Sequence, residues 1–123
     1  MEIHASQQLQ SAVIKFGKYV FLPQKRILYF KRQSVNLTKK ESRLLAMLCN
    51  CANQLLPRSY ALINLWQNDT YFNSRSMDVY VSRLRKHLKD DPDILIMNVY
   101  GQGFKLLVPQ IEIMSAETQT VIY

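Results

Sequence analysis

The sequence has few of the residues that make a chain flexible, and its apolar residues do not form long runs. It holds three glycines and four prolines among 123 residues and no low-complexity segment, which excludes an intrinsically disordered chain. Its longest unbroken apolar run, residues 44–49, is far shorter than the roughly 20 residues of a membrane-spanning helix. The first ten residues lack the cationic start and apolar stretch of a signal peptide. We therefore expect one globular, cytoplasmic domain without a membrane partner.

Cysteine and histidine are also scarce, which argues against metal and redox chemistry. Cys49 and Cys51 lie two residues apart in a predicted helix, so their side chains leave in nearly opposite directions and cannot bridge each other. His4 and His87 have no zinc-ligand spacing and no nucleophile or carboxylate partner in sequence context. We read both thiols as small buried apolar groups, and we expect no metal, no cofactor and no enzymatic activity.

Negative charge is scarce relative to positive charge. The chain has 16 Lys and Arg against 9 Asp and Glu. All the cations precede Pro109, whereas two of the acids, Glu112 and Glu117, follow it, so residues 1–108 carry a net charge of +9. Many basic proteins use such an excess only to stay soluble, but on a small domain it favours a polyanionic partner such as nucleic acid.

Residue patterns divide the chain into a linker or tail over 1–11, a domain over 12–108 and a C-terminal tail over 109–123. Residues 12–38 are rich in Val, Ile, Phe and Tyr and are broken by Gly17, by Pro23 and by the polar residues 31–34. This pattern predicts three or four short antiparallel strands. The final SAETQTVIY is read either as mobile or as an added strand.

Two helices are expected after these strands. The sequence TKKE is a capping box in which Thr38 accepts from the amide of Glu41 and Glu41 reaches back. Apolar residues then follow at helical spacing, namely Leu44, Leu45, Leu48 and Ala52. A shorter helix, about Ser59–Trp66, places three apolar residues on one face, namely Leu62, Ile63 and Trp66.

The stretch NSRSMDVYVSRLRKHLKDD predicts a third helix of about residues 74–89. Asn73 or Ser74 is the expected N-cap, and the helix ends before Pro92. Apolar residues form one stripe that can bury against the other helices: Met77, Val81, Leu84 and Leu88. The opposite side, flanked by Asp78 and Arg85, carries Arg75, Val79, Ser82, Arg83 and Lys86.

This opposite face carries the side-chain types that a DNA major groove rewards. Arg pairs with guanine O6 and N7, Asp accepts from the cytosine amino group, and Val contacts the thymine methyl group. A solvated helix face with incidental ion pairs explains the same residues. Both readings stay open on this helix alone.

The following residues, 94–108, predict a β-hairpin. Two apolar runs flank GQG at 101–103, and a GxG between strands with no helix after it is a turn rather than a phosphate loop. By alternation, Ile96, Asn98 and Tyr100 share one face of the first strand. Three helices followed by a hairpin make a winged helix, in which the third helix enters the major groove.

Three segments resemble the C-terminal effector domain of OmpR/PhoB-type two-component response regulators: VNLTKKESRLLAMLCNCANQLLPRSYALINLW, SRSMDVYVSRLRKHLKDDP and ILIMNVYGQGFKL. The resemblance runs from about Val13 to Val108, with element order and spacings preserved. It implies an α+β winged helix-turn-helix with an N-terminal four-stranded antiparallel sheet, a three-helix bundle and a C-terminal β-hairpin wing. The implied function is sequence-specific double-stranded DNA binding that controls transcription in phosphorelay signal transduction.

The resemblance also implies partners. They are double-stranded DNA with direct-repeat half-sites, bound by a head-to-tail pair, RNA polymerase and, indirectly, a cognate sensor kinase. An N-terminal phosphoacceptor domain normally precedes such a domain and is absent from this sequence, so we expect a fragment that begins in the interdomain linker. The surface implied for RNA polymerase is one loop: Gln67, Asn68, Asp69, Thr70, Tyr71, Phe72 and Asn73.

Functional positions follow from the resemblance residue by residue. The implied base readers are Asp78, Val79 and Arg83. The implied phosphate contacts are Trp66, through its indole N–H, with Arg75, Ser76, Tyr80, Arg85 and Asn98, to which we add Ser82 and Lys86 from the same helix. In the wing, the residues expected near DNA are Tyr100, Gln102 and Lys105. Four residues depart from those frequent in the family: Tyr80 for His, Ser82 for Arg, Tyr100 for Arg and Phe104 for Tyr.

The main alternative is a winged-helix protein-interaction module without specific DNA binding. Salt separates the two readings, because DNA binding releases counterions and weakens steeply with salt, whereas an apolar protein interface does not. An RNA-binding role is disfavoured because the A-form major groove is too narrow for a helix.

Overall fold

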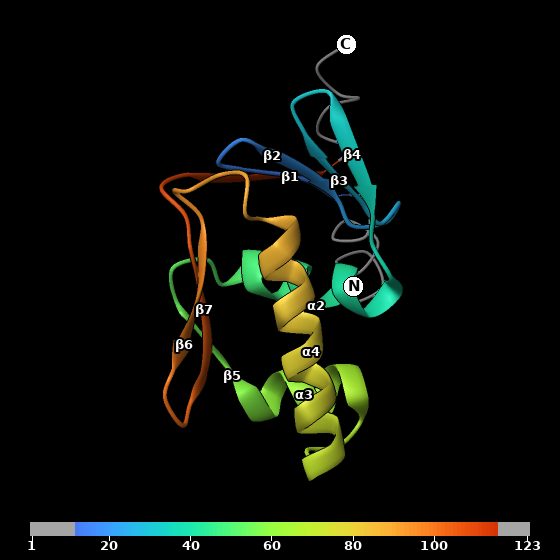
Figure 1. Cartoon of the computed structure of the whole chain (residues 1–123), viewed down its shortest axis with the longest axis vertical. Helices are drawn as coiled ribbons and strands as arrows, with labels where there is room; N and C mark the ends of the chain where they lie inside the picture. Colours follow the sequence, from blue (N-terminus) through green and yellow to red (C-terminus); the bar gives the residue numbers. More distant parts are fainter. Residues whose placement is uncertain (1–11, 116–123) are drawn as a thin grey trace.

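The computed structural model describes residues 12–115, which form two antiparallel sheets and three helices (Figure 1). The larger sheet has the order β4-β3-β2-β1-β8 and the smaller one β5-β7-β6. In Figure 1 the larger sheet lies at the top, the β6–β7 hairpin runs down the left side, and α4 descends in front. The elements are β1 (Ala12–Phe16), β2 (Tyr19–Leu22), β3 (Ile27–Phe30), β4 (Gln33–Asn36), α2 (Lys39–Asn50), β5 (Leu55–Pro57), α3 (Arg58–Trp66), α4 (Tyr71–His87), β6 (Leu95–Val99), β7 (Gly103–Leu107) and β8 (Ile111–Ser115).

The first four strands of the larger sheet are those predicted from residues 12–38. Ile14 lies opposite Phe21, and Phe21 opposite Leu28, so one row of buried side chains crosses three strands. A fifth strand, β8, pairs with β1. This strand lies within residues 109–123, which we assigned to a C-terminal tail. The described part of that segment therefore includes the edge strand of the larger sheet. The predicted linker over 1–11 and residues 116–123 lie outside the described residues.

Helix α2 begins as the sequence predicts. The Thr38 hydroxyl accepts from the Glu41 N–H over 3.1 Å, and a Glu41 carboxylate oxygen accepts from the Thr38 N–H over 2.7 Å. Leu44, Leu45 and Leu48 are buried. The helix ends at Asn50, so our extension of the helical spacing to Ala52 was wrong.

Helix α3 packs with a face that differs from the predicted one at Ile63. Its buried residues are Ala61, Leu62 and Leu65, whereas Ile63 is 55% exposed and Trp66 is half-buried. The helix must pack against both α2 and α4, and side chains at 61, 62 and 65 meet that requirement together. Ile63, about 100° beyond Leu62 around the helix, turns to solvent.

Helix α4 begins earlier than predicted. Thr70 is the N-cap, and its hydroxyl accepts from the Asn73 N–H over 3.3 Å. The Asn73 side chain instead donates to the Trp66 carbonyl and to Asn68 in the preceding loop. The predicted start at Asn73 or Ser74 was therefore wrong by one turn. The apolar stripe was correct, because its four members are all buried: Met77, Val81, Leu84 and Leu88.

The smaller sheet contains the predicted hairpin and a strand that we did not predict. β5 pairs with β7, with Leu56 opposite Phe104. A Cβ at Gly103 would lie 2.1 Å from the Leu56 carbonyl oxygen, so the strands approach this closely only because residue 103 is glycine. The wing is therefore anchored to the segment that leads into α3.

The two cysteines differ in their surroundings. Cys49 is buried, whereas Cys51 is half-buried and its thiol donates to the Met47 carbonyl over 3.2 Å. The prediction that both are buried apolar groups was thus correct for Cys49 only. Burial raises the pKa of both thiols, so neither forms a thiolate readily.

Candidate nucleic-acid interface

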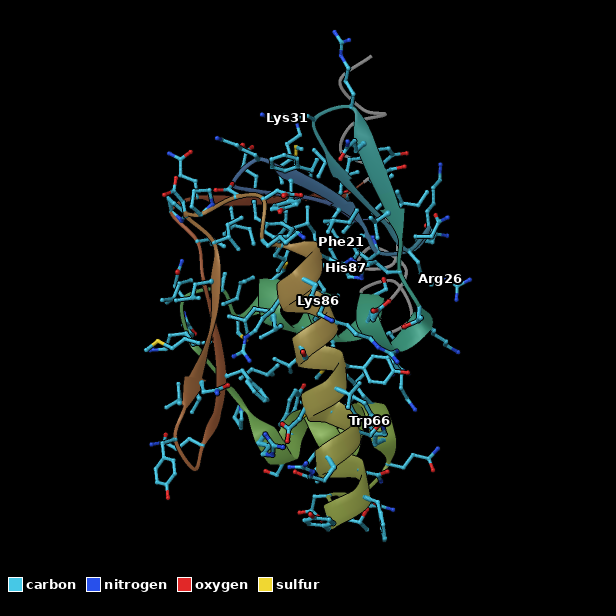
Figure 2. All side chains as sticks on the ribbon, in the orientation of Figure 1. Phe21, Arg26, Lys31, Trp66, Lys86 and His87 are labelled. Atoms are coloured by element: carbon cyan, nitrogen blue, oxygen red, sulfur yellow. The ribbon has the colours of Figure 1, made fainter. Side chains whose placement is uncertain are left out.

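The face of α4 opposite its apolar stripe is open to solvent. The members of this face are all exposed, with Val79 at 50%: Arg75, Val79, Ser82, Arg83 and Lys86. Ser76, Asp78 and Tyr80 are half-buried along its edges. Figure 2 labels Lys86 near the upper, C-terminal end of α4, above Trp66. One helix thus presents the predicted cations, the small hydroxyl and the apolar contact on a single surface.

Aromatic rings support one edge of this face. Trp66, the last residue of α3, meets Tyr80 edge to face with ring centroids 5.7 Å apart. The Arg83 guanidinium carbon lies 4.9 Å from the Tyr80 ring centroid. A guanidinium stacked on a tyrosine keeps its N–H groups free at its edges. Tyr80 thereby orients the Arg83 side chain.

Asp78 has a partner that the sequence did not reveal. Arg58 Nη2 donates to Asp78 Oδ1 over 2.7 Å. The same guanidinium donates to the Ser74 hydroxyl and carbonyl oxygens over 2.7–3.0 Å and lies 5.4 Å from the Phe104 ring centroid. No local signal could have indicated this pair, because the two residues are 20 positions apart and belong to different helices.

Arg85 connects α4 to the wing. Its Nε and Nη2 donate to the Ile96 carbonyl over 3.1 and 2.8 Å, and Nη2 also donates to Asn98 Oδ1 over 2.9 Å. Both residues were predicted only as phosphate contacts, so sequence reasoning missed their bond to each other. The contact links the hairpin directly to α4.

The tip of the wing is more exposed than alternation predicts. β6 ends at Val99, and Tyr100 lies in the turn, 98% exposed. Ile96 is 3% exposed, and Asn98, two residues along the same strand, accepts from Arg85 of α4. Our expectation that Ile96, Asn98 and Tyr100 share one face was therefore correct for Ile96 and Asn98 and wrong only for Tyr100, which lies beyond the strand. Gln102 is exposed and accepts at its carbonyl from the Arg58 N–H over 2.9 Å, whereas Lys105 is half-buried.

The segment predicted to contact RNA polymerase is part loop and part helix. Gln67, with φ 74°, ends α3, and residues 67–70 form the loop. Tyr71 and Phe72 already belong to α4, are 72% and 82% exposed, and meet edge to face. Asn73 is half-buried because its side chain closes the loop.

Within residues 12–115 the structure contains neither a metal-binding cluster nor a membrane-spanning helix. No group of three or more His, Cys, Asp or Glu side chains in this range could hold a metal ion. In the same range, every helix is too short or too polar to cross a membrane.

Comparison with known proteins identifies the family. The family described as "Transcriptional regulatory protein, C terminal" matches residues 32–106. The transcriptional regulatory protein RprY of Bacteroides fragilis is 48% identical over 110 residues, which are 89% of this chain and 47% of that protein. This chain belongs to the family. Membership makes it a non-enzymatic domain of a transcription regulator.

Further relatives are similar over the same region. The phosphate regulon regulatory protein PhoB of Rhizobium meliloti is 31% identical over 104 residues, covering 83% of this chain and 45% of that protein. The chain thus spans about half the length of the curated relatives it matches. The elements of the candidate interface are α3, α4, β6 and β7. They lie within the residues 32–106 that match the family, except for the last residue of β7.

Solved structures agree with the fold. The DNA-binding domain of E. coli CadC has a TM-score of 0.69 at 24% identity, over 86% of this chain and 98% of that domain. The Klebsiella pneumoniae RstA DNA-binding domain in complex with the RstA box has a TM-score of 0.65 at 30% identity, over 77% of this chain and 96% of that domain. The predicted α+β winged helix-turn-helix is confirmed.

Proposed function

We propose that this domain binds double-stranded DNA in a sequence-dependent manner, as the output domain of a two-component response regulator. In this proposal α4 lies in the major groove, and the wing contacts the backbone or an adjacent minor groove. The observation that carries it is the arrangement of α4, whose apolar stripe is buried while Arg75, Arg83 and Lys86 are exposed on the opposite face. The charge excess of the chain favours the same partner.

Within this function, the proposed base contacts are Arg83, Val79 and Asp78. Arg83 takes a guanine, because the residue is exposed and its guanidinium lies over the Tyr80 ring. Phosphate contacts are proposed for the residues that surround these three: Trp66, Arg75, Ser76, Tyr80, Ser82 and Lys86. Arg85 bonds to Asn98 and to the backbone of the wing. The polar atoms of Arg85 and Asn98 that these bonds do not use can contact phosphates.

The proposed partners follow the family resemblance. Two copies bind direct-repeat half-sites head to tail, and residues 67–73 face RNA polymerase. The exposed Tyr71 and Phe72 supply apolar area of the kind that protein interfaces use. A phosphoacceptor domain and a sensor kinase would act upstream.

The test is a selection of bound duplexes from a random pool, followed by measurement of Kd against salt on the selected and on a random duplex. We expect a recurring motif with two direct repeats and a log–log slope of about −0.9 for each phosphate neutralised. A pool without enrichment, together with affinity that ignores salt, would favour the protein-interaction module instead.

A further inference from the structure

A row of cations and aromatic rings crosses from α2 to α4 at the edge of the proposed interface. Lys40 Nζ lies 5.2 Å from the centroid of the Trp66 ring. The Trp66 ring contacts the Tyr80 ring, and the Arg83 guanidinium lies over the Tyr80 ring. We call these four residues the Lys40–Arg83 row. Because three helices contribute to it, the packing of the bundle determines its geometry.

Lys40 differs from an ordinary surface lysine. It is half-buried in the first turn of α2, and within residues 12–115 no carboxylate forms an ion pair with it. A lysine that packs its stem against an aromatic ring keeps its ammonium group in water. The Trp66 contact therefore holds an unneutralised cation at a defined position beside the interface.

We propose that Lys40 binds a DNA backbone phosphate on the side of α4 away from the wing. This inference rests on the proposed function. In Figure 2, Trp66 lies on the side of α4 opposite to the β6–β7 hairpin. A Lys40 ammonium above the Trp66 ring and the Trp66 indole N–H can reach one phosphate or two adjacent ones. The domain then holds the duplex backbone at both edges of the major groove, with α4 between them.

Lys39 provides a matched control for this role. It has the same charge and lies in the same helical turn, but it is exposed and borders a surface hollow with Pro23, Arg26 and Ser42, toward the larger sheet. Successive residues of a helix point about 100° apart. Only Lys40 therefore belongs to the row.

The experiment compares Lys40→Gln, Lys39→Gln and Lys40→Arg in the full chain, with Kd measured against salt on the selected duplex. Lys40→Gln should reduce the log–log slope by about 0.9 and weaken binding roughly five- to tenfold at 0.1 M salt. Lys39→Gln should change the slope by less than half as much, and Lys40→Arg should retain it. Thermal unfolding of each variant checks that the domain remains folded.

Neutral methylphosphonates placed singly along the duplex provide a second measurement. One position outside the groove bound by α4 should weaken the unmodified chain but not Lys40→Gln, because the contact is already lost. The proposal would be overturned if Lys40→Gln and Lys39→Gln reduced the salt slope equally, or if no methylphosphonate position affected the unmodified chain alone. Either result would leave DNA binding intact. If the Kd of the unmodified chain for the duplex did not change with salt, the proposed function itself would be overturned.

Discussion

Arg58, the first residue of α3, holds Asp78 in the middle of α4 by a 2.7 Å hydrogen-bonded ion pair. The guanidinium also bonds to Ser74 one turn earlier on α4. An acid that appears to stand alone among cations in the sequence is therefore neutralised from another helix. Asp78 keeps one carboxylate oxygen for a further partner, and its orientation depends on Arg58.

We expect the two residues to be energetically coupled. Arg58→Ala should destabilise the domain by about 1 kcal/mol through lost hydrogen bonds, and Asp78→Ala by less. The coupling energy in a double-mutant cycle should be about 0.5 kcal/mol, because both side chains are partly exposed, at 32% and 44%. Urea unfolding of the four variants measures it. Arg75→Ala, paired with Asp78→Ala, is the control that should show additivity.

Asp78→Ala should change DNA selectivity more than stability. Removing the carboxylate ends its repulsion of phosphates and leaves Arg58 uncompensated, so random duplex should bind as tightly or more tightly. Discrimination against the wrong base at one position should fall, because a cytosine amino group loses its acceptor. Kd values on selected and random duplexes decide this. Weaker binding to random DNA would instead show that Asp78 acts only in the structure.

Arg83→Ala should remove preference at one base pair. The lost bidentate contact to guanine corresponds to about 1–3 kcal/mol on the selected site, with random duplex little affected. Arg75→Ala serves as the comparison, since a phosphate contact should weaken both duplexes alike. If Arg83→Ala also reduces both affinities equally, Arg83 contacts phosphate and not a base.

Tyr100→Arg should strengthen the wing. Tyr100 is 98% exposed in the turn and Phe104 is only 4% exposed, so the tyrosine is not a buried partner of Phe104 and its replacement leaves the core intact. An arginine there can enter a narrow, A·T-rich minor groove. The salt slope should steepen by about 0.9, with a larger gain on A-tract flanks than on G·C flanks. An unchanged slope on both probes would mean that the tip does not reach DNA.

Gly103→Ala should be far more damaging than Gly101→Ala. A Cβ at residue 103 would collide with the Leu56 carbonyl oxygen, whereas nothing lies within 4 Å of one at residue 101. We expect Gly101→Ala, at φ +71°, to cost about 1–2 kcal/mol from the left-handed backbone alone. Gly103→Ala should cost at least about 3 kcal/mol, because β5 must separate from β7. Thermal unfolding compares them, and equal losses would contradict the steric argument.

Local patterns in the sequence determined much of this domain. The capping box at Thr38, the stripe from Met77 to Leu88 and the GQG turn each depend on residues within a few positions of one another. Helical and strand periodicities follow from backbone geometry, so they show which side of an element is buried before any partner is known. The outward face of α4 followed directly from its apolar stripe.

Only the tertiary structure decided which residues meet across elements. Arg58 with Asp78, Arg85 with Asn98, and Lys40 with Trp66 are contacts between different elements, and β8 pairs with the far end of the chain, β1. Periodicity encodes burial but not the identity of the neighbour. That identity depends on how the helices cross and which strand edge is open, and both are fixed only when the whole core packs.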